Sequence, residues 1–313
     1  MINRKIAIIG DGAVGSSIAF ALTLSDLVSE IVIIDINKAK VEGDVLDLNH
    51  SMSLTHPKKI IAGEYKDIEN AKVIVLACGV GQREGETRIQ LLERNKRVFD
   101  SVIDSMKPYI HKEAIVLVVS NPVDILSYYT STKLNLPKSQ VFGSGTVLDT
   151  ARLKYLLSAD TGIDPRNIHA YVIGEHGDSE IAAFSVTSIA GLSIEKFCEG
   201  CGKCKGFKER GFAAMQDDVR HAAYEIIQKK GATYYGIAAS TKRIIKAILN
   251  NEHSVLTVST YLKNEFNGMV DDVYLSLPVV VGSMGVERII RPEYSQEEVE
   301  GLVKSAEILK QNR

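Results

Sequence analysis

Three glycines near the N-terminus, Gly10, Gly12 and Gly15, follow an apolar run in the spacing Gly-x-Gly-x-x-Gly, with Val14 inside the turn. Glycine lets the backbone approach a pyrophosphate closely, and the first turn of a following helix offers free N–H groups and a positive dipole end to phosphates. Asp35 ends the next apolar run, where a carboxylate can bond ribose hydroxyls and repel a 2′-phosphate. The spacing therefore predicts a site for NAD rather than NADP, with a plain glycine-rich turn as the alternative.

His176, flanked by Gly174 and Gly177, is a residue type that can donate or accept a proton near neutral pH. Arg152 carries a planar, two-pronged donor that matches a substrate carboxylate better than lysine does. Asp149 lies three residues before Arg152, on the same face of a predicted helix. Taken singly, a histidine or an arginine is more often an ordinary core or surface residue, so this interpretation depends on the surrounding segments.

Four segments supply that context, although each by itself could be a polar loop. They read CGVGQREGETR at 78–88, SNPVD at 120–124, GSGTVLDTAR at 143–152 and GEHGDSE at 174–180. In this order, behind a dinucleotide motif, they resemble the lactate/malate dehydrogenase family, and in particular its lactate dehydrogenases. The segment KGATYYGIA at 230–238 extends the resemblance over essentially the whole chain.

The resemblance implies a reversible hydride transfer between NADH and pyruvate that gives (S)-lactate and NAD⁺, as in fermentative glycolysis. His176 would donate and accept the proton, and Asp149 would bond the other ring nitrogen to fix the tautomer and stabilise the imidazolium. Arg152 would bind the substrate carboxylate. Arg88 closes a glycine-rich loop and would approach the developing oxyanion as that loop closes.

The resemblance also assigns residues around the nicotinamide. Asn121 would bond the substrate oxygen or the nicotinamide ribose, while Ser144 and Thr233 would line the pocket. Gly79 would contribute to the cofactor site. For Asn121, Ser144 and Thr233, an ordinary turn residue is the alternative. No metal ion is expected in this site.

Gln82 bears on the choice of substrate. Malate dehydrogenases of the family carry an arginine at the matching position, which pairs with the second carboxylate of oxaloacetate. A closed site without that cation would leave the carboxylate buried and unpaired, at a cost of several kcal/mol. Arg83 is a complication, but Gln82 keeps the family spacing of six residues before Arg88. Malate dehydrogenase or another 2-hydroxy acid dehydrogenase is the nearest alternative, followed by an NAD-dependent glycosidase and a nucleotide-binding protein without catalysis.

Partners and regulation follow from charge and from the resemblance. The net charge is −2, so the chain has no basic excess of the kind that nucleic-acid-binding proteins show. The apolar runs are too short to cross a bilayer, and no signal peptide is predicted, which indicates a cytoplasmic protein.

Bacterial lactate dehydrogenases often bind fructose 1,6-bisphosphate between subunits; His169 matches one ligand position, and Lys154 replaces an arginine at the other. We expect a homotetramer from the resemblance alone.

The fold follows from alternating strand and helix patterns. Short β-branched runs at Lys5–Ile9, Ile31–Asp35, Val73–Ala77 and Ile115–Val119 alternate with helical stretches, which is typical of a doubly wound parallel sheet. We therefore expect an α/β protein. A Rossmann domain at residues 1–144 would bind NAD, and an α+β domain at residues 145–313 would carry the substrate site.

In the second half, strand patterns are predicted at His169–Ile173, Glu180–Ile189, Leu256–Leu262 and Asp272–Val281. A last helix is expected to begin at Ser295, because Glu298 three residues later completes a capping box. Three cysteines, Cys198, Cys201 and Cys204, have a spacing typical of thiolate metal ligands, but zinc normally takes four ligands. We expect this segment to be an exposed loop with reduced thiols.

Overall fold

A twisted eight-stranded sheet connects the two halves of the protein. The computed structural model describes residues 4–81 and 88–313. The strand order is β14-β13-β6-β5-β4-β1-β2-β3, and every pairing among β1 to β6 is parallel. The six parallel strands are β1 Lys5–Ile9, β2 Glu30–Ile34, β3 Lys59–Ala62, β4 Val73–Leu76, β5 Ile115–Val118 and β6 Val141–Gly143.

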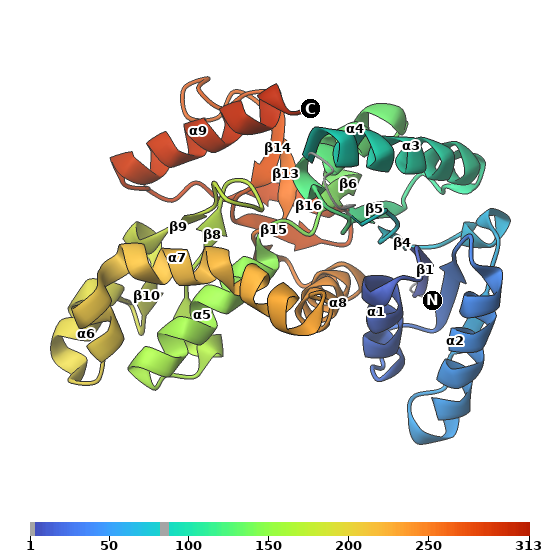
Figure 1. Cartoon of the computed structure of the whole chain (residues 1–313), viewed down its shortest axis with the longest axis horizontal. Helices are drawn as coiled ribbons and strands as arrows, with labels where there is room; N and C mark the ends of the chain where they lie inside the picture. Colours follow the sequence, from blue (N-terminus) through green and yellow to red (C-terminus); the bar gives the residue numbers. More distant parts are fainter. Residues whose placement is uncertain (1–3, 82–87) are drawn as a thin grey trace.

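Helices connect the parallel strands and cover both faces of the sheet, as the right-handed crossover rule requires (Figure 1). Two apolar clusters lie on opposite faces, and the strands between them are almost fully buried because their isoleucines and valines face helices on both sides. This is the Rossmann arrangement predicted from the sequence. The connecting helices are α1 Ala13–Thr23, α2 Lys38–His50, α3 Arg88–Met106 and α4 Val123–Lys133.

The second half is the predicted α+β arrangement of longer helices and short antiparallel strands. Its helices are α5 Val147–Thr161, α6 Ile194–Cys201, α7 Lys205–Lys230, α8 Tyr235–Leu249 and α9 Gln296–Gln311. Its strands are β7 Ile168–His169, β8 Val172–Ile173, β9 Ile181–Ala182, β10 Ser188–Ile189, β11 Leu192–Ser193, β12 Ser254–Leu256, β13 Ser259–Leu262, β14 Val273–Ser276, β15 Val279–Gly282 and β16 Gly285–Ile289.

All four strands predicted in this half are divided in the structure. The run Leu256–Leu262 ends β12 in one sheet and then forms β13 in the main sheet. The run Asp272–Val281 divides in the same way, because Pro278 separates β14 from β15. The run His169–Ile173 contributes to β7 and β8, which also belong to different sheets. Alternation in the sequence predicted extended backbone but not which sheet each part would join.

The run Glu180–Ile189 is likewise not one strand. A short 3₁₀ turn at Phe184–Val186 separates β9 from β10. Ser185 donates its backbone N–H at 3.0 Å to Glu298 at the start of α9, and its hydroxyl bonds the same carboxylate. That helix begins at the predicted capping box, where the Ser295 side chain accepts the Glu298 N–H and Glu298 accepts the Ser295 N–H. Glu298 therefore caps its own helix and fixes the turn beside it.

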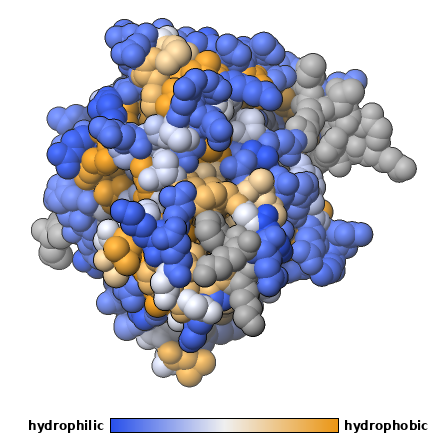
Figure 2. Space-filling view, turned by 90° about the vertical axis from the view of Figure 1, so that its left-hand side faces the viewer, coloured by the Kyte–Doolittle hydropathy of each residue, from blue (hydrophilic) through white to orange (hydrophobic). Residues whose placement is uncertain are grey.

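The cysteine segment is not the exposed loop that was expected. Cys198 lies in α6, and Cys204 is the N-terminal cap just before α7; both are buried. Polar residues cover most of the face that contains this end of the molecule, with apolar patches between them (Figure 2). Within the described ranges, none of the helices has the length and apolar character needed to cross a membrane.

Candidate active site

The glycine-rich turn lies at the carboxyl end of β1, in the crevice where parallel sheets bind ligands. Gly10 has φ +103°, and a Cβ there would lie 2.4 Å from the backbone nitrogen of Cys78. A Cβ on Gly15 would lie 1.8 Å from the carbonyl oxygen of Gly10, so both positions exclude side chains for packing reasons. A Cβ on Gly12 would meet nothing within 4 Å. Gly12 precedes α1 without a side-chain cap, which leaves an open helix N-terminus suited to a pyrophosphate.

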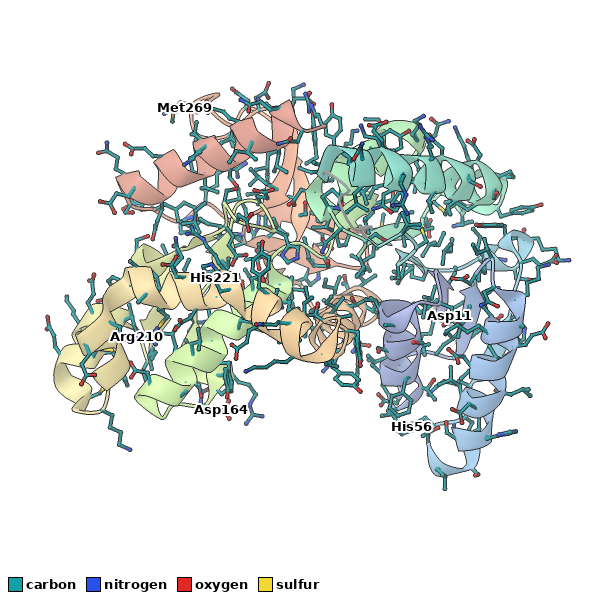
Figure 3. The ribbon with its side chains drawn as sticks, in the orientation of Figure 1. Asp11, His56, Asp164, Arg210, His221 and Met269 are labelled. Atoms are coloured by element: carbon teal, nitrogen blue, oxygen red, sulfur yellow. The ribbon has the colours of Figure 1, made fainter. Side chains whose placement is uncertain are left out.

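Asp35 is placed next to this turn by the first βαβ unit. Its carboxylate accepts the backbone N–H of Asp11 at 2.7 Å and that of Asn37 at 2.9 Å. Asp11 was not predicted as a site residue. Its buried side chain lies between α1 and α2 (Figure 3), 3.1 Å from the ammonium group of Lys40, and burial raises its pKa to about 6. Two carboxylates thus border the crevice, and such hydrogen-bond acceptors fit the ribose hydroxyls of NAD and repel the extra phosphate of NADP.

The structure brings together the three residues predicted to act on the substrate. Oδ2 of Asp149 lies 2.6 Å from Nδ1 of His176, and Oδ1 of Asp149 lies 2.6 Å from Nη1 of Arg152. Asp149 and Arg152 share one face of α5, whereas His176 reaches them from the loop after β8. The Asp149 side chain is 2% exposed, while those of Arg152 and His176 are 14% and 23% exposed. One carboxylate therefore orients both an imidazole and a guanidinium, and both still reach solvent.

Charges around His176 favour its protonated form. Burial by itself disfavours an imidazolium, but the carboxylates of Asp149, Asp124 and Glu180 outweigh it and raise the pKa of His176 to about 9. Burial also acts against the ionised form of Asp149. The nearby His176 and Arg152 outweigh that cost and hold the pKa of Asp149 below its usual range. The dyad is thus arranged to store one proton on the imidazole.

Asp124 and Ser276, which were not predicted as site residues, fix the backbone at and just before His176. Asp124, in the first turn of α4, accepts the His176 N–H at 2.8 Å and a hydrogen bond from the Ser259 hydroxyl. The preceding Gly174 exchanges two backbone hydrogen bonds of 2.9 Å with Ser276 of β14. The segment that contains Gly174 and His176 is therefore attached to the main sheet. Asp124 is the last residue of the SNPVD segment. Its place in this motif is the sequence feature that could have identified it as a site residue.

Glu180 is a further residue that was not predicted. Its side chain is buried, and its Oε1 makes no hydrogen bond within the described residues. Ligand atoms of Glu180, Asp149 and His176 all lie within 4.8 Å of one another. Burial, followed by the charge of Asp149, raises the pKa of Glu180 to about 8. The same spacing could hold a cation, but both Asp149 oxygens already engage His176 and Arg152, so the dyad has its charge balance without a metal ion.

Only some of the residues predicted to border the nicotinamide lie close to one another in the structure. Asn95, in α3, accepts the Val80 N–H at 2.9 Å and donates to the carbonyl oxygen of Asn121 at 3.4 Å, so it links the loops after β4 and β5. Ser144, after β6, donates its N–H to Val118 at 2.8 Å and therefore lies beside the end of β5.

The other predicted site residues lie in other parts of the structure or outside the described residues. Thr233 is half-buried in the connection between α7 and α8. Arg88 begins α3, but its side chain lies outside the described residues, as do Gln82 and Arg83 in full. Lys154 of α5 is half-buried, and burial followed by the charge of Arg243 lowers its pKa. His169 is exposed on β7.

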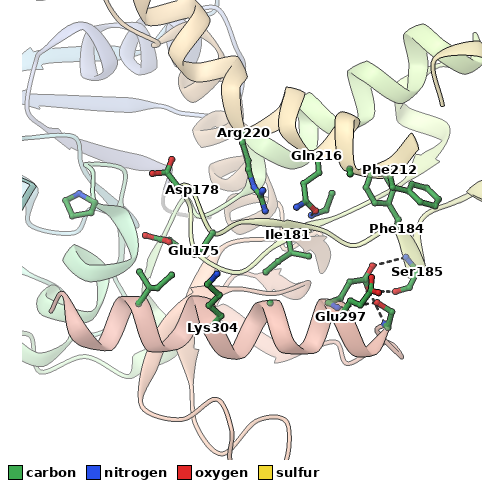
Figure 4. Close-up of a pocket in the computed structure, with 18 of the residues that line it drawn as sticks. Glu175, Asp178, Ile181, Phe184, Ser185, Phe212, Gln216, Arg220, Glu297 and Lys304 are labelled. Atoms are coloured by element: carbon green, nitrogen blue, oxygen red, sulfur yellow. Dashed lines mark hydrogen bonds between the residues drawn. The ribbon is translucent and has the colours of Figure 1, made fainter. Parts of the chain in front are cut away.

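A cavity of about 1090 Å³ lies beside the segment that contains His176, between α7 and α9 (Figure 4). Glu175, Asp178, Ile181, Arg220 and Lys304 are among its lining residues, but His176, Asp149 and Arg152 are not. We therefore do not assign this cavity as the place where the substrate reacts.

Two protein-family models match this chain. Residues 4–143 match the family model described as lactate/malate dehydrogenase, NAD binding domain. Residues 146–313 match the model described as lactate/malate dehydrogenase, alpha/beta C-terminal domain. Together the two models account for almost the whole chain.

Individual relatives agree with the family models. L-lactate dehydrogenase of Acetivibrio thermocellus is 46% identical over 308 residues, which cover 98% of this chain and 96% of that protein. L-lactate dehydrogenase 1 of Clostridium acetobutylicum is 47% identical over 311 residues, which cover 99% and 97%. The solved structure of the lactate dehydrogenase MGS-M5, from a Medee basin deep-sea metagenome library, superposes with a TM-score of 0.94 at 41% identity and covers 100% of this chain and 98% of its own. The minor L-lactate dehydrogenase from Enterococcus mundtii, in its ligands-bound form, gives 0.94 at 39% identity with the same coverage.

Proposed function

The chain belongs to the lactate/malate dehydrogenase family, and from this premise we propose that it is an NAD-dependent L-lactate dehydrogenase. The reaction is the reversible reduction of pyruvate to (S)-lactate. The observation that carries the proposal is the line Arg152–Asp149–His176, joined by two contacts of 2.6 Å. It places a carboxylate-binding cation beside a proton donor, as a 2-oxo acid requires.

When bound, NADH supplies the hydride that reduces C2 of pyruvate. Nδ1 of His176 is engaged by Asp149, so Nε2 presents the proton to the substrate carbonyl. Transfer of the Nε2 proton to that oxygen neutralises the negative charge that develops there, and Asp149 stabilises the imidazolium before the transfer. Arg152 uses Nη1 on Asp149, and the rest of its guanidinium binds the substrate carboxylate. In lactate oxidation the same nitrogen of His176 takes the proton back.

We assign the rest of the site by the same reasoning. Gly10, Gly12, Val14, Gly15 and Asp35 hold the adenosine and pyrophosphate part of NAD, because the open turn before α1 and the Asp35 carboxylate suit those groups. Gly79, Asn121, Ser144 and Thr233 would border the nicotinamide and the substrate. Arg88 would polarise the carbonyl oxygen.

Substrate preference depends on Gln82. An amide at this position has no charge to pair with the second carboxylate of oxaloacetate, so we propose that pyruvate is preferred. The test is NADH oxidation by the purified protein with pyruvate and oxaloacetate in parallel. We expect kcat/KM to favour pyruvate by a hundredfold or more, about 3 kcal/mol, and Gln82→Arg to reverse the preference. A native preference for oxaloacetate would mean that Arg83 faces the substrate.

We propose that the two domains divide at residues 144 and 145, which lie between the two family-model matches.

We also propose a cytoplasmic homotetramer. Apolar side chains of Phe20, Leu24 and Tyr235 are each more than half exposed along a hollow of about 460 Å³ between α1 and α8. Such a surface is expected to be covered by another subunit. Light scattering on the eluting protein tests the assembly, and a monomer would contradict it.

Regulation by fructose 1,6-bisphosphate is a second part of the proposal. Lys154 of α5 has Arg243 of α8 as an electrostatic neighbour, and His169 lies on β7, which packs against α5. Clustered cations of this kind suit phosphate groups, although lysine lacks the two-pronged geometry of arginine. We expect millimolar effector to raise turnover at low pyruvate, and Lys154→Ala to abolish the response. Unchanged turnover of the native enzyme would end the proposal.

A further inference from the structure

Three thiols converge where α6 ends and α7 begins. Cys198 and Cys201 are one helical turn apart in α6, so their side chains share a face. Gly202 ends that helix with φ +66°, a conformation that favours glycine, and turns the chain back. Cys204, the N-terminal cap of α7, then contacts both earlier thiols. The Cys201-Gly202-Lys203-Cys204 turn is not used by the proposed dehydrogenase reaction.

The three thiols differ in accessibility and environment. Cys198 and Cys204 are each 1% exposed and pack in the apolar cluster between α5 and α7, whereas Cys201 reaches solvent. The backbone N–H of Lys203 donates to Sγ of Cys201 at 3.4 Å. Burial and the neighbouring thiols raise the pKa of Cys204, so it stays protonated beside Cys201. A solvent-accessible sulfur thus lies against a buried thiol.

We propose that Cys201 and Cys204 form an oxidation site, at which a hydroperoxide converts the two thiols into an intramolecular disulfide. Cys201 is the attacking sulfur because it alone of the three is accessible, and Cys204 is the resolving sulfur because its thiol already contacts Cys201. Cys201 and Cys204 lie three positions apart across the turn at Gly202, so a disulfide between them closes a short loop. Cys198 contacts Cys204 as well, so it can exchange into the bond.

The chemistry balances with the peroxide as the sole oxidant. The Cys201 thiolate attacks the O–O bond, takes up one oxygen as a sulfenic acid and releases hydroxide, which the proton lost by the thiol converts to water. The sulfur of Cys204 then attacks the sulfenic sulfur. The S–O bond breaks, and the hydroxyl leaves with the Cys204 proton as a second water. Two thiols lose two electrons and two protons, and one hydrogen peroxide is reduced to two waters.

The test exposes the full-length protein to hydrogen peroxide, blocks the remaining thiols and maps the peptides by mass spectrometry. We expect a Cys201–Cys204 disulfide, with the loss of two hydrogens, before Cys78 is modified. Cys78 is the internal control, because burial raises its pKa to about 12 and it lies after β4, far along the chain from the cluster. Cys78→Ser should oxidise like the native protein, and Cys201→Ser should lose the disulfide.

A second variant separates the chemistry from folding. In Cys204→Ala the resolving thiol is absent, so Cys201 should accumulate as a sulfenic acid that dimedone labels, or as a bond to Cys198. Pyruvate reduction within about twofold of the native rate, together with an unchanged circular dichroism spectrum, would show that the variant is folded. Reduced Cys201 and Cys204 after peroxide treatment, or oxidation of Cys78 first, would overturn the proposal.

Discussion

The backbone N–H of His176 donates a hydrogen bond of 2.8 Å to the carboxylate of Asp124, which lies 52 residues earlier in the chain. The two residues come from different halves of the protein. Asp124 begins α4 against the parallel sheet, and His176 follows β8. His176, the proton donor that we propose, is thus held at its backbone by one aspartate and at its ring by another, Asp149. Asp124 holds the backbone of His176 and adds to the charge that favours its protonated ring, while Asp149 binds the ring directly.

Removing the Asp124 carboxylate should loosen the loop. Asp124→Ala leaves the His176 N–H and the Ser259 hydroxyl without their partner, and a buried unsatisfied donor costs about 1–3 kcal/mol. We expect lower stability to urea and a fall in kcat of at least about tenfold, with the affinity for NADH unchanged. Ser259→Ala, which removes only one of the two bonds, is the matched control. Native kcat in the Asp124 variant would contradict the assigned role.

The raised pKa of His176 predicts opposite pH profiles for the two directions. Pyruvate reduction needs the imidazolium, so its kcat/KM should be constant at lower pH and fall as the pH rises through about 9. Lactate oxidation needs the neutral ring and should rise over the same interval. Because the folded pKa lies above the ordinary value of 6.5, this group stabilises the fold fully below pH 6.5 and loses that contribution as the pH passes about 9.

Asp149 is the principal cause of that raised pKa and can be tested in the same assay. Asp149→Asn removes the charge that holds the proton, so the midpoint of pyruvate reduction should move to lower pH. The rate should fall by about 10²–10⁴-fold, because an amide stabilises the imidazolium poorly. A midpoint unchanged from the native enzyme would show that another group titrates in the profile.

Glu180 should modulate this titration without touching the substrate. Its pKa of about 8 means that it ionises just before His176 loses its proton, and its charge then helps His176 to retain it. Glu180→Gln should lower the midpoint of the pH profile by roughly half to one unit and leave the rate at neutral pH within a few fold. Asp178→Asn removes an exposed carboxylate from the same loop, where solvent screens its charge, and should leave the midpoint unchanged. Equal shifts in both variants would contradict a specific role for Glu180.

Arg152 should determine how tightly pyruvate binds. Arg152→Lys keeps a positive charge near Asp149 but replaces a two-pronged donor with a point charge. We expect the KM for pyruvate to rise about 10–100-fold, which corresponds to roughly 1.5–3 kcal/mol for one charge-assisted hydrogen bond. The affinity for NADH, followed by its fluorescence, should not change. A change confined to NADH binding would move Arg152 out of the substrate site.

The sequence by itself determined the features that depend on local spacing. The alternation of β-branched runs with helices predicted the parallel sheet, because buried parallel strands need apolar residues on both faces. The glycine spacing before α1 and the capping box at Ser295 are likewise properties of a few neighbouring residues. The family resemblance added the roles of His176, Asp149 and Arg152, and these three do converge.

Only the tertiary structure decided what depends on contacts between distant segments. Asp124 and Glu180 stood in quoted motifs, but nothing local shows that they surround His176, since burial and the charge of distant neighbours set their pKa values. The division of Leu256–Leu262 between two sheets is equally non-local, because a strand pattern does not name its partner. Cys204 was expected in an exposed loop, yet it packs against α5 because the turn at Gly202 folds α7 back over the thiols.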